Sequence, residues 1–446
     1  ADGIATITHD APGAPVNTMT EQWQADLAAV VDRVEADKEH IKGVLVTSAK
    51  KTFFAGAQLD SVLAMREADA PAAFAAIEAM KRSFRRLETC GRPVVALLNG
   101  AALGGGWELA LAAHARFALD DEKIRFGTPE VTLGLIPGAS GIVKTVRLLG
   151  LLAAQPYLME GRLFGPREAL DLGLVDGMVP TLEGLRERAL AWIAEHPDAR
   201  QPWDRKDYKM PGGTPASPKL AAQLTLAPAM LSAKTHGLYP APQAILETMV
   251  EGALVDVDTA LRIESRKLAK VMTSQVARNM IQAFFYDLNA VKADEGFDKA
   301  RLAQKLERVQ RAFVAEGAAM LEEGIPAPLV EHAADAIGMP PGSLAAITAQ
   351  AVDRPAIDVD FEELKQRLLY RQAVEAARCL ADGVVASVPE ANIGSILGCG
   401  FPAWTGGALQ FVRSQGVEDF LRRADALAAR HGERFALSGA ARRAIR

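Results

Sequence analysis

Two acidic residues and a run of three glycines are the residues of this sequence whose types and spacing favour chemistry. Gly104, Gly105 and Gly106 come directly before WELALAAHA, a segment of strong helix formers. Glycines there leave backbone N–H groups open to a ligand, and the positive end of the helix dipole adds attraction for an anion. The run suits an oxygen atom that gains negative charge during a reaction.

The acidic residues are Glu108 and Glu130. Glu108 lies within WELAL, so we expect apolar surroundings, and burial raises the pKa of a carboxyl toward the range useful for proton transfer. Glu130 lies in FGTPEVTLG, where Thr128 can cap and Pro129 can begin a short helix that Gly134 ends. Two carboxylates beside a glycine turn rich in N–H donors favour acid and base catalysis on a carbonyl compound.

Each of these features has an ordinary explanation when it is taken alone. A triple glycine is often a flexible turn, and a glutamate in the first turn of a helix complements the helix dipole. Motifs without context are weak indications. The functional interpretation depends on the three features acting together.

The elements that must position these residues follow an alternating pattern. Residues 3–8, 42–49 and 93–98 are predicted strands, and helices are predicted over WQADLAAVVDRVEADKE, capped by Thr18 or Thr20, and around 69–88. Strands separated by helices indicate layered α/β structure with parallel pairing. His114 is predicted to lie on another face of the helix that carries Glu108, in a structural role.

The character of the chain changes from about residue 190. WDRKDYKMPGGTPASPKL reads as a surface loop or linker because Pro and Gly disfavour continuous helix. Helices are then predicted over QAILETMVEGAL, over DTALRIESRKLAKVM with Asp258 as its cap, and over SQVARNMIQAFFYDLNAV with Ser274 as its cap. The aromatic cluster at 284–286 is predicted to serve packing rather than cofactor binding.

Composition limits the possible partners. The chain has 446 residues, 49% hydrophobic and 24% charged, with a formal net charge of −5, which argues against a general nucleic-acid surface. Its three cysteines, Cys90, Cys379 and Cys399, are far apart, so neither a disulfide framework nor a metal site is predicted. No apolar run reaches about 18 residues, so no transmembrane segment is expected.

The unpaired cysteines fit a reducing compartment, and the expected location is the bacterial cytoplasm or an organellar matrix. The chain begins inside a predicted strand, so a leader could have been removed.

Four ordered motifs resemble the crotonase family, and more narrowly the hydratase portion of multifunctional fatty-acid β-oxidation α-subunits. They are FFAGAQLD at 53–60, RPVVALLNGAALGGGWELALA at 92–112, FGTPEVTLGLIPGASG at 126–141 and EALDLGLVDGMV at 168–179. The resemblance implies a spiral of repeated ββα turns over 1–190. Gln58 departs from the pattern, since many relatives carry an acid there.

The resemblance also implies roles for particular residues. The oxyanion hole would be the backbone N–H groups of Ala57 and Gly105, and the catalytic carboxylates would be Glu108 and Glu130; which is acid and which is base stays open. Further substrate contacts would come from Ala55, Gly56, Gly104, Trp107, Pro137 and Gly138. Exposed cations could meet the phosphates of coenzyme A, although a solvated face is the more ordinary explanation for each: Lys50, Lys51, Arg66 and Lys81.

The implied activity is hydration of trans-2-enoyl-CoA to 3-hydroxyacyl-CoA in fatty-acid β-oxidation. Isomerisation of the double bond could be a second activity, but family members limited to isomerisation tend to lose the first acid, so Glu108 favours hydration. Hydration would need no cofactor, because coenzyme A is part of the substrate, and no metal.

The remainder of the chain resembles the same α-subunits without their NAD-binding domain. Linker helices are expected over 191–295, and 296–446 resembles the helical repeats of the 3-hydroxyacyl-CoA dehydrogenase C-terminal domain. No strand–GxGxxG–helix pattern follows Asn289; the formal match, GCGFPA at 398–403, is not followed by a helix-forming segment. Two alternatives follow: a longer parent protein that is also an NAD-dependent dehydrogenase, or a helical tail that serves as a docking surface for a thiolase β-subunit in a hetero-oligomer.

Overall fold

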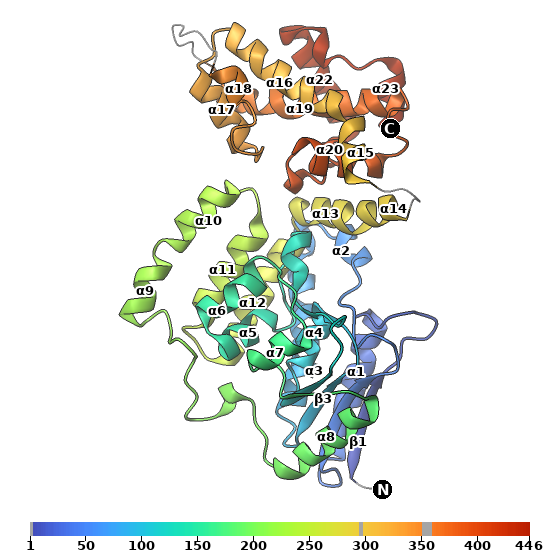
Figure 1. Ribbon diagram of the computed structural model, residues 1–446, viewed down its shortest axis with the longest axis vertical. Coiled ribbons are helices and arrows are strands. Elements are labelled where there is room, and N and C mark those ends of the chain that lie inside the picture. Colours follow the sequence, from blue (N-terminus) through green and yellow to red (C-terminus); the bar gives the residue numbers. More distant parts are fainter. Residues whose placement is uncertain (1–2, 294–297, 350–358) are drawn as a thin grey trace. The chain divides into compact units, whose positions relative to one another are not determined.

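The computed structural model describes residues 3–293, 298–349 and 359–446, and the chain divides into two compact units (Figure 1). Unit 1 comprises Ala1–Pro228 and Ala241–Ser274, and unit 2 comprises Ala229–Pro240 and Gln275–Arg446. The predicted class, an α/β region followed by helices, is confirmed. The predicted boundary between residues 295 and 296 lies outside the described residues.

A parallel five-stranded sheet forms the centre of unit 1, in the order β1-β2-β3-β5-β7. Each strand is short, and all five residues of β3 are buried, as expected for a parallel sheet covered on both faces. The bounds are β1 Ile4–His9, β2 Gly43–Ser48, β3 Val94–Leu98, β5 Ala115–Leu119 and β7 Gly177–Val179.

Alternate residues of β3 pack on opposite faces of the sheet, as the twofold period of a strand requires. Val94, Ala96 and Leu98 join the core formed with α1 (Glu21–Ala36) and α3 (Ala70–Glu88). Val95 and Leu97 join the core formed with α8 (Leu182–Glu195). Of the two caps considered for α1, the structure selects Thr20, whose side chain accepts the Trp23 N–H.

The loops that follow the strands are tied together beyond the carboxyl ends of the sheet. A two-stranded sheet pairs β4 (Ala102–Leu103) with β6 (Phe126–Gly127). The Leu103 N–H donates to the Phe54 carbonyl at 3.0 Å, and the Gly104 N–H donates to the Gly127 carbonyl at 2.8 Å. These bonds bring the loop containing Ala57 beside the glycine run.

Two expectations about these loops were wrong. The helix after the glycines, α4 (Gly105–Ala110), has six residues and ends before His114, whose ring instead accepts the Val94 N–H at 2.9 Å. The short helix with Glu130 is η2 (Pro129–Leu133), a 3-10 turn; Gly134 ends it in the left-handed conformation, but the Thr128 side chain makes no cap bond. Local sequence favours a helix at both places. Tertiary hydrogen bonds determine where α4 ends and how η2 begins.

The other helices of unit 1 surround this region. Helix α12 packs against α3 and α5, and it is capped by Asp256, whose side chain accepts the Thr259 N–H, rather than by the expected Asp258. The bounds are α2 Asp60–Ala64, η1 Glu67–Asp69, α5 Gly141–Leu149, α6 Leu151–Met159, α7 Pro166–Asp171, η3 Pro202–Asp204, α9 Pro218–Leu224, α10 Ala227–Thr235, which extends into unit 2, α11 Pro240–Gly252 and α12 Val257–Met272.

Unit 2 is helical in the part of the chain that the structure describes. Its core gathers around α19 (Phe361–Ala381), which packs against α16, α17, α21 and α23. The other elements are α13 Gln275–Ile281, the π-helical turn η4 Gln282–Asp287, α14 Leu288–Lys292, α15 Lys299–Lys305, α16 Glu307–Glu322, α17 Ala327–Ala336, α18 Ala345–Thr348, α20 Val388–Cys399, η5 Ala403–Thr405, α21 Ala408–Gln415, α22 Val417–His431, η6 Glu433–Phe435 and α23 Gly439–Ala444.

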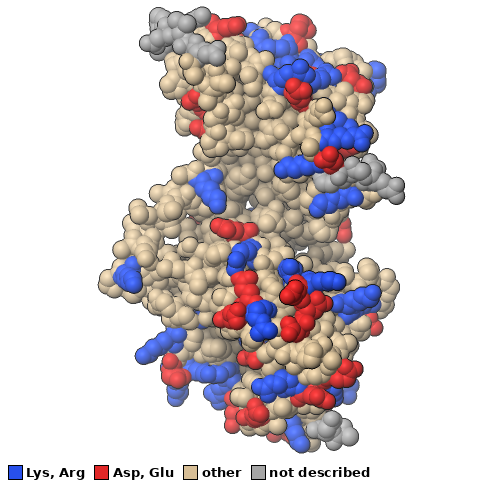
Figure 2. Space-filling model, in the orientation of Figure 1, with Lys and Arg blue, Asp and Glu red and all other residues tan. Residues whose placement is uncertain are grey.

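The face of the molecule drawn in Figure 2 carries charges of both signs. Figure 2 shows basic and acidic side chains interspersed on the visible face rather than gathered by sign. Among the helices of the described ranges, none combines the length and the apolar character that a membrane crossing requires.

Candidate active site

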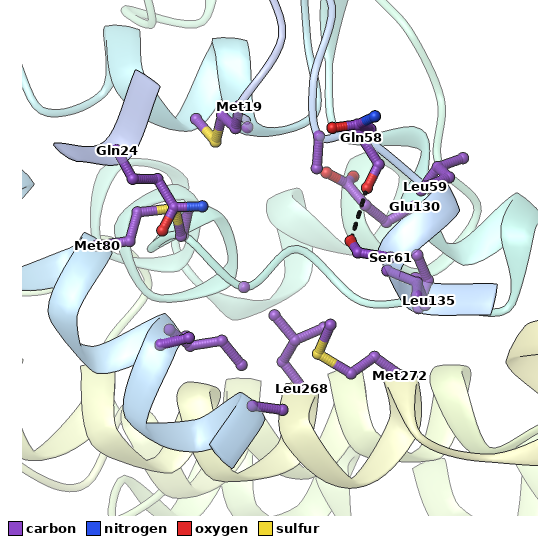
Figure 3. A pocket seen from close by; sticks show the side chains of 18 of the residues that line it. Met19, Gln24, Gln58, Leu59, Ser61, Met80, Glu130, Leu135, Leu268 and Met272 are labelled. Atoms are coloured by element: carbon purple, nitrogen blue, oxygen red, sulfur yellow. Dashed lines mark hydrogen bonds between the residues drawn. The ribbon is translucent and has the colours of Figure 1, made fainter. Parts of the chain in front are cut away.

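A cavity of about 230 Å³ lies in unit 1, between the loops beyond the sheet and helices α3 and α12. In Figure 3, Leu268 and Met272 of α12 form one side of the cavity, and Glu130 lies on another side with Gln58 and Leu59. Most of the lining is apolar: Met19, Ala57, Leu59, Val62, Met65, Ala73, Ala76, Ile77, Met80, Leu135, Ile136, Ala139, Leu268 and Met272.

Glu108 reaches this cavity from α4 and is almost completely buried, with 2% of its surface exposed. Its Oε1 accepts two backbone hydrogen bonds, from Ala139 N–H at 2.7 Å and from Gly141 N–H at 2.6 Å. Burial raises the pKa of Glu108 well above its usual value, and the negative charges of Glu130 and Glu264 raise it further. The two N–H bonds oppose this shift without cancelling it.

Glu130 lines the same cavity from η2. The residue as a whole is only partly buried, but its Oε2 is enclosed and has no hydrogen-bond partner among the described residues. Burial raises the pKa of Glu130 to about 7, and the charge of Glu264 contributes to that rise. A carboxyl with this pKa can give or take a proton near neutral pH.

Two backbone donors accompany the acids. Ala57 and Gly105 both line the cavity, and neither backbone N–H makes a hydrogen bond within the described ranges. Gly104 has φ +55°, and a Cβ there would lie 2.7 Å from Glu130 Oε1. A Cβ at Gly106 would lie 2.5 Å from the Phe54 carbonyl oxygen. The glycine run therefore lets the two loops and Glu130 approach each other closely.

The remaining predicted contacts are placed differently. Gly138 lines the cavity. Trp107 points into the core, where its ring stacks on Phe126 with centroids 5.2 Å apart. Residues outside the cavity lining, although next to it in the chain, are Ala55, Gly56, Gly104 and Pro137. Direct substrate contact stays a prediction for all of the predicted site residues, inside and outside the lining.

Sequence reasoning missed a third buried carboxylate, Glu264 of α12. Its side chain is 0% exposed and lies 2.7 Å from Lys81 Nζ of α3, so Lys81 does not lie on the solvated face that we expected. The sequence contains a signal for it: Glu264 falls three residues after Leu261 and four before Leu268, on the apolar face of an amphipathic helix. A charge on that face needs a partner.

This arrangement can move protons on an apolar molecule that carries a carbonyl group. Burial raises the pKa of both carboxyls, and two like charges in a low-dielectric site repel each other, so protonation of these acids is easier than in water. The unbonded N–H groups of Ala57 and Gly105 can hold an oxygen that becomes negative.

The class of protein follows from the sequence profile that matches this region. The profile described as "Enoyl-CoA hydratase/isomerase" matches residues 1–236, more than half of the chain. The chain therefore belongs to the enoyl-CoA hydratase/isomerase family.

Among individual proteins, the chain is similar to the fatty acid oxidation complex subunit alpha of Shewanella species. It is 33% identical to that of Shewanella amazonensis over 72% of this chain and 44% of the relative, and 34% identical to that of Shewanella halifaxensis over 64% and 40%. The chain thus spans less than half the length of these relatives. A solved structure, human mitochondrial delta3-delta2-enoyl-CoA isomerase, is similar with a TM-score of 0.47 and 24% identity, over 66% of this chain and 96% of that one.

Proposed function

We propose that this chain adds water across the 2,3 double bond of a trans-2-enoyl-CoA thioester to give a 3-hydroxyacyl-CoA, as a step of fatty-acid β-oxidation. One observation carries the proposal: two enclosed carboxyls with raised pKa values share an apolar cavity with two unbonded backbone N–H groups. Family membership supports it.

The backbone donors act on the thioester. Its carbonyl oxygen accepts the N–H groups of Ala57 and Gly105. When water adds to C3, the electrons of the double bond move toward that oxygen and an enolate-like charge develops there. The fixed donors stabilise this charge more than they stabilise the neutral carbonyl, and this difference lowers the barrier.

The carboxyls handle the protons. One takes a proton from the water as its oxygen bonds to C3, and the other delivers a proton to C2, so the pair ends with the same number of protons. Glu108 is fixed by the N–H groups of Ala139 and Gly141, whereas Glu130 keeps an Oε2 without a hydrogen-bond partner among the described residues. That free oxygen suits a bond to the reacting water.

The apolar part of the cavity accounts for the acyl chain. Met80, Leu268 and Met272 lie along it, and methionine side chains adapt to flexible alkyl groups. The step needs no cofactor in this proposal, because the two carboxyls of the chain accept and donate the protons.

Isomerisation is a second candidate activity of the same cavity. A single carboxyl with pKa about 7 and an unpartnered oxygen, as in Glu130, can take a proton from C2 of a 3-enoyl-CoA and return it to C4. The double bond then moves to the 2,3 position without any water.

A spectrophotometric assay tests both activities. With 2-enoyl-CoA thioesters of several chain lengths, we expect loss of the absorbance of the conjugated thioester; with 3-enoyl-CoA, isomerisation would generate it. A folded protein that leaves the 2-enoyl absorbance unchanged at every chain length would refute hydration. Comparison across chain lengths would define the acyl preference.

The longer relatives suggest two further properties. A parent protein of their length would also be an NAD-dependent 3-hydroxyacyl-CoA dehydrogenase, but the described residues do not fit NAD: GCGFPA closes α20, with Gly400 as its left-handed cap, instead of opening a helix.

The relatives are named as subunits of a complex, which supports a thiolase partner, and co-elution with a thiolase would test it. Their bacterial origin favours the cytoplasm.

A further inference from the structure

We infer that Glu264 is a positioning residue for the acid pair, acting from α12 through the turn that also holds Glu108; this inference rests on the proposed function. Glu264 Oε1 accepts the Ser140 N–H at 2.7 Å, and its Oε2 accepts the Val143 N–H at 3.0 Å. Glu264 does not line the cavity, so it does not touch substrate.

The two carboxylates hold neighbouring amides of one turn. The N–H groups of Ala139 and Gly141 donate to Glu108, whereas those of Ser140 and Val143 donate to Glu264. The turn is therefore bonded to α4 through Glu108 and to α12 through Glu264. A movement of the turn relative to α12 also moves the two N–H groups that hold Glu108.

The conformation of the turn shows that it needs such restraint. Ser140 has a backbone φ of +100°, which residues other than glycine rarely adopt. Its Oγ has no hydrogen-bond partner among the described residues. Such a conformation persists only where its surroundings determine it. Glu264 provides part of that restraint, and Lys81 Nζ in turn bonds Glu264 Oε1 and the Leu261 carbonyl.

Glu264 also acts through its charge, which raises the pKa of both Glu108 and Glu130. Other charged groups lie near Glu264 or near its cationic neighbours, and they are unchanged in the variants below. They are Lys81, Arg85 and Glu88 on α3, Lys144 and Arg147 on α5, Asp204 on η3, and Asp256 and Asp258 at the start of α12.

The first test is Glu264→Gln in the full chain. Its amide cannot accept both N–H bonds, so we expect kcat for 2-enoyl-CoA hydration to fall on the order of 100-fold, with KM little changed. Loss of the negative charge lowers the pKa of both acids, so both limbs of the pH profile should move to lower pH by roughly one unit. Unmoved limbs would overturn the electrostatic part of the inference.

The second test, Glu264→Asp, separates position from charge. Aspartate keeps the charge but is one methylene shorter, so it cannot reach Ser140 and Val143 together. We expect kcat to fall on the order of tenfold while both pH limbs stay in place. This milder variant decides the matter if Glu264→Gln does not fold: wild-type kcat in the folded aspartate variant would overturn the positioning role.

A matched control is Glu316→Gln in unit 2. Glu316 is also 0% exposed and ion-paired, with Arg367 and Arg434, but it belongs to the other unit. We expect hydration to keep its kcat and both pH limbs there. If the wild-type protein hydrates no enoyl-CoA, the proposed function fails; if it does and the Glu264 variants behave like the control, only this inference fails.

Discussion

The two acids of the cavity in unit 1 and the buried acids of unit 2 are accommodated in opposite ways. In unit 2, Glu316 is fully enclosed, with Arg367 at 2.6 Å from its Oε1 and Arg434 at 2.6 Å from its Oε2. In unit 1, Glu108 and Glu130 form no ion pair within the described residues. Both arrangements carry a desolvation cost, but only the first offsets it with opposite charge.

The difference appears in the protonation of the two sets of acids. Burial alone would raise the pKa of Glu323 and of Glu375, but hydrogen bonds from Arg367 and Arg371 outweigh it and hold both pKa values below the usual range. Burial raises the pKa of Glu108, and no cation among the described residues offsets that effect. Pairing therefore distinguishes an acid that stabilises the fold from one that can exchange a proton.

The largest expected effect comes from removing the unpaired acids. Glu108→Gln or Glu130→Gln should each lower the hydration rate by about two to four orders of magnitude, the scale of a positioned proton-transfer group. The free energy of unfolding should not fall, since a neutral amide is easier to bury than a carboxylate. Steady-state rates with crotonyl-CoA and a thermal melt would check this, and near-wild-type rates in either variant would refute the assigned roles.

Removing the cation of a paired acid should have the opposite outcome. Arg367→Met leaves Arg434 as the remaining described partner of Glu316 and Glu323, so we expect unit 2 to lose about 3 kcal/mol of stability, the lower end of the range for a broken buried pair, while hydration continues. Urea unfolding followed by circular dichroism measures the change. Equal loss of stability and hydration rate would contradict the separation of the two roles.

The stability of unit 1 should depend on pH through Glu130. Its pKa is about 7 in the folded chain against an ordinary value of 4.5, so the folded state keeps a proton that the unfolded state loses. The stability it contributes is complete below pH about 4.5 and is lost as the pH rises through about 7. The free energy of unfolding, plotted against pH across this window, should change less for Glu130→Gln than for wild type. Equal slopes of the two plots would count against the raised pKa.

The smallest effect is expected at an exposed pair. Asp419 and Arg422 of α22 form an ion pair with side chains 54% and 75% exposed. Asp419→Asn should change the free energy of unfolding by less than about 1 kcal/mol, because solvent screens the charges. A loss as large as that of Arg367→Met would show that burial does not set the importance of pairing in this unit.

Much of unit 1 could be predicted because its signals are local. Apolar residues on both sides of Glu108 correctly indicated its burial, alternation indicated β1, and the polar residue before the first helix identified Thr20 as one of two caps. The α/β class follows from these elements in sequence order.

The remainder depends on contacts between distant parts of the chain. Nothing near Ser140 in the sequence shows that its N–H meets Glu264, 124 residues later. In the same way, Lys81 looks like an ordinary solvated lysine until α12 covers it. The early end of α4 and the missing Thr128 cap also reflect tertiary bonds overriding local propensity.

The position of α12 at the end of unit 1 has a consequence during synthesis. Leu268 and Met272 close the cavity, and Glu264 fixes the turn behind Glu108, so a nascent polypeptide that has folded its sheet still lacks one wall of the site. Water can then reach the carboxylates and screen them. Residues up to about 272 must leave the ribosome before the cavity is complete, so the proposed activity would begin only when unit 1 is finished.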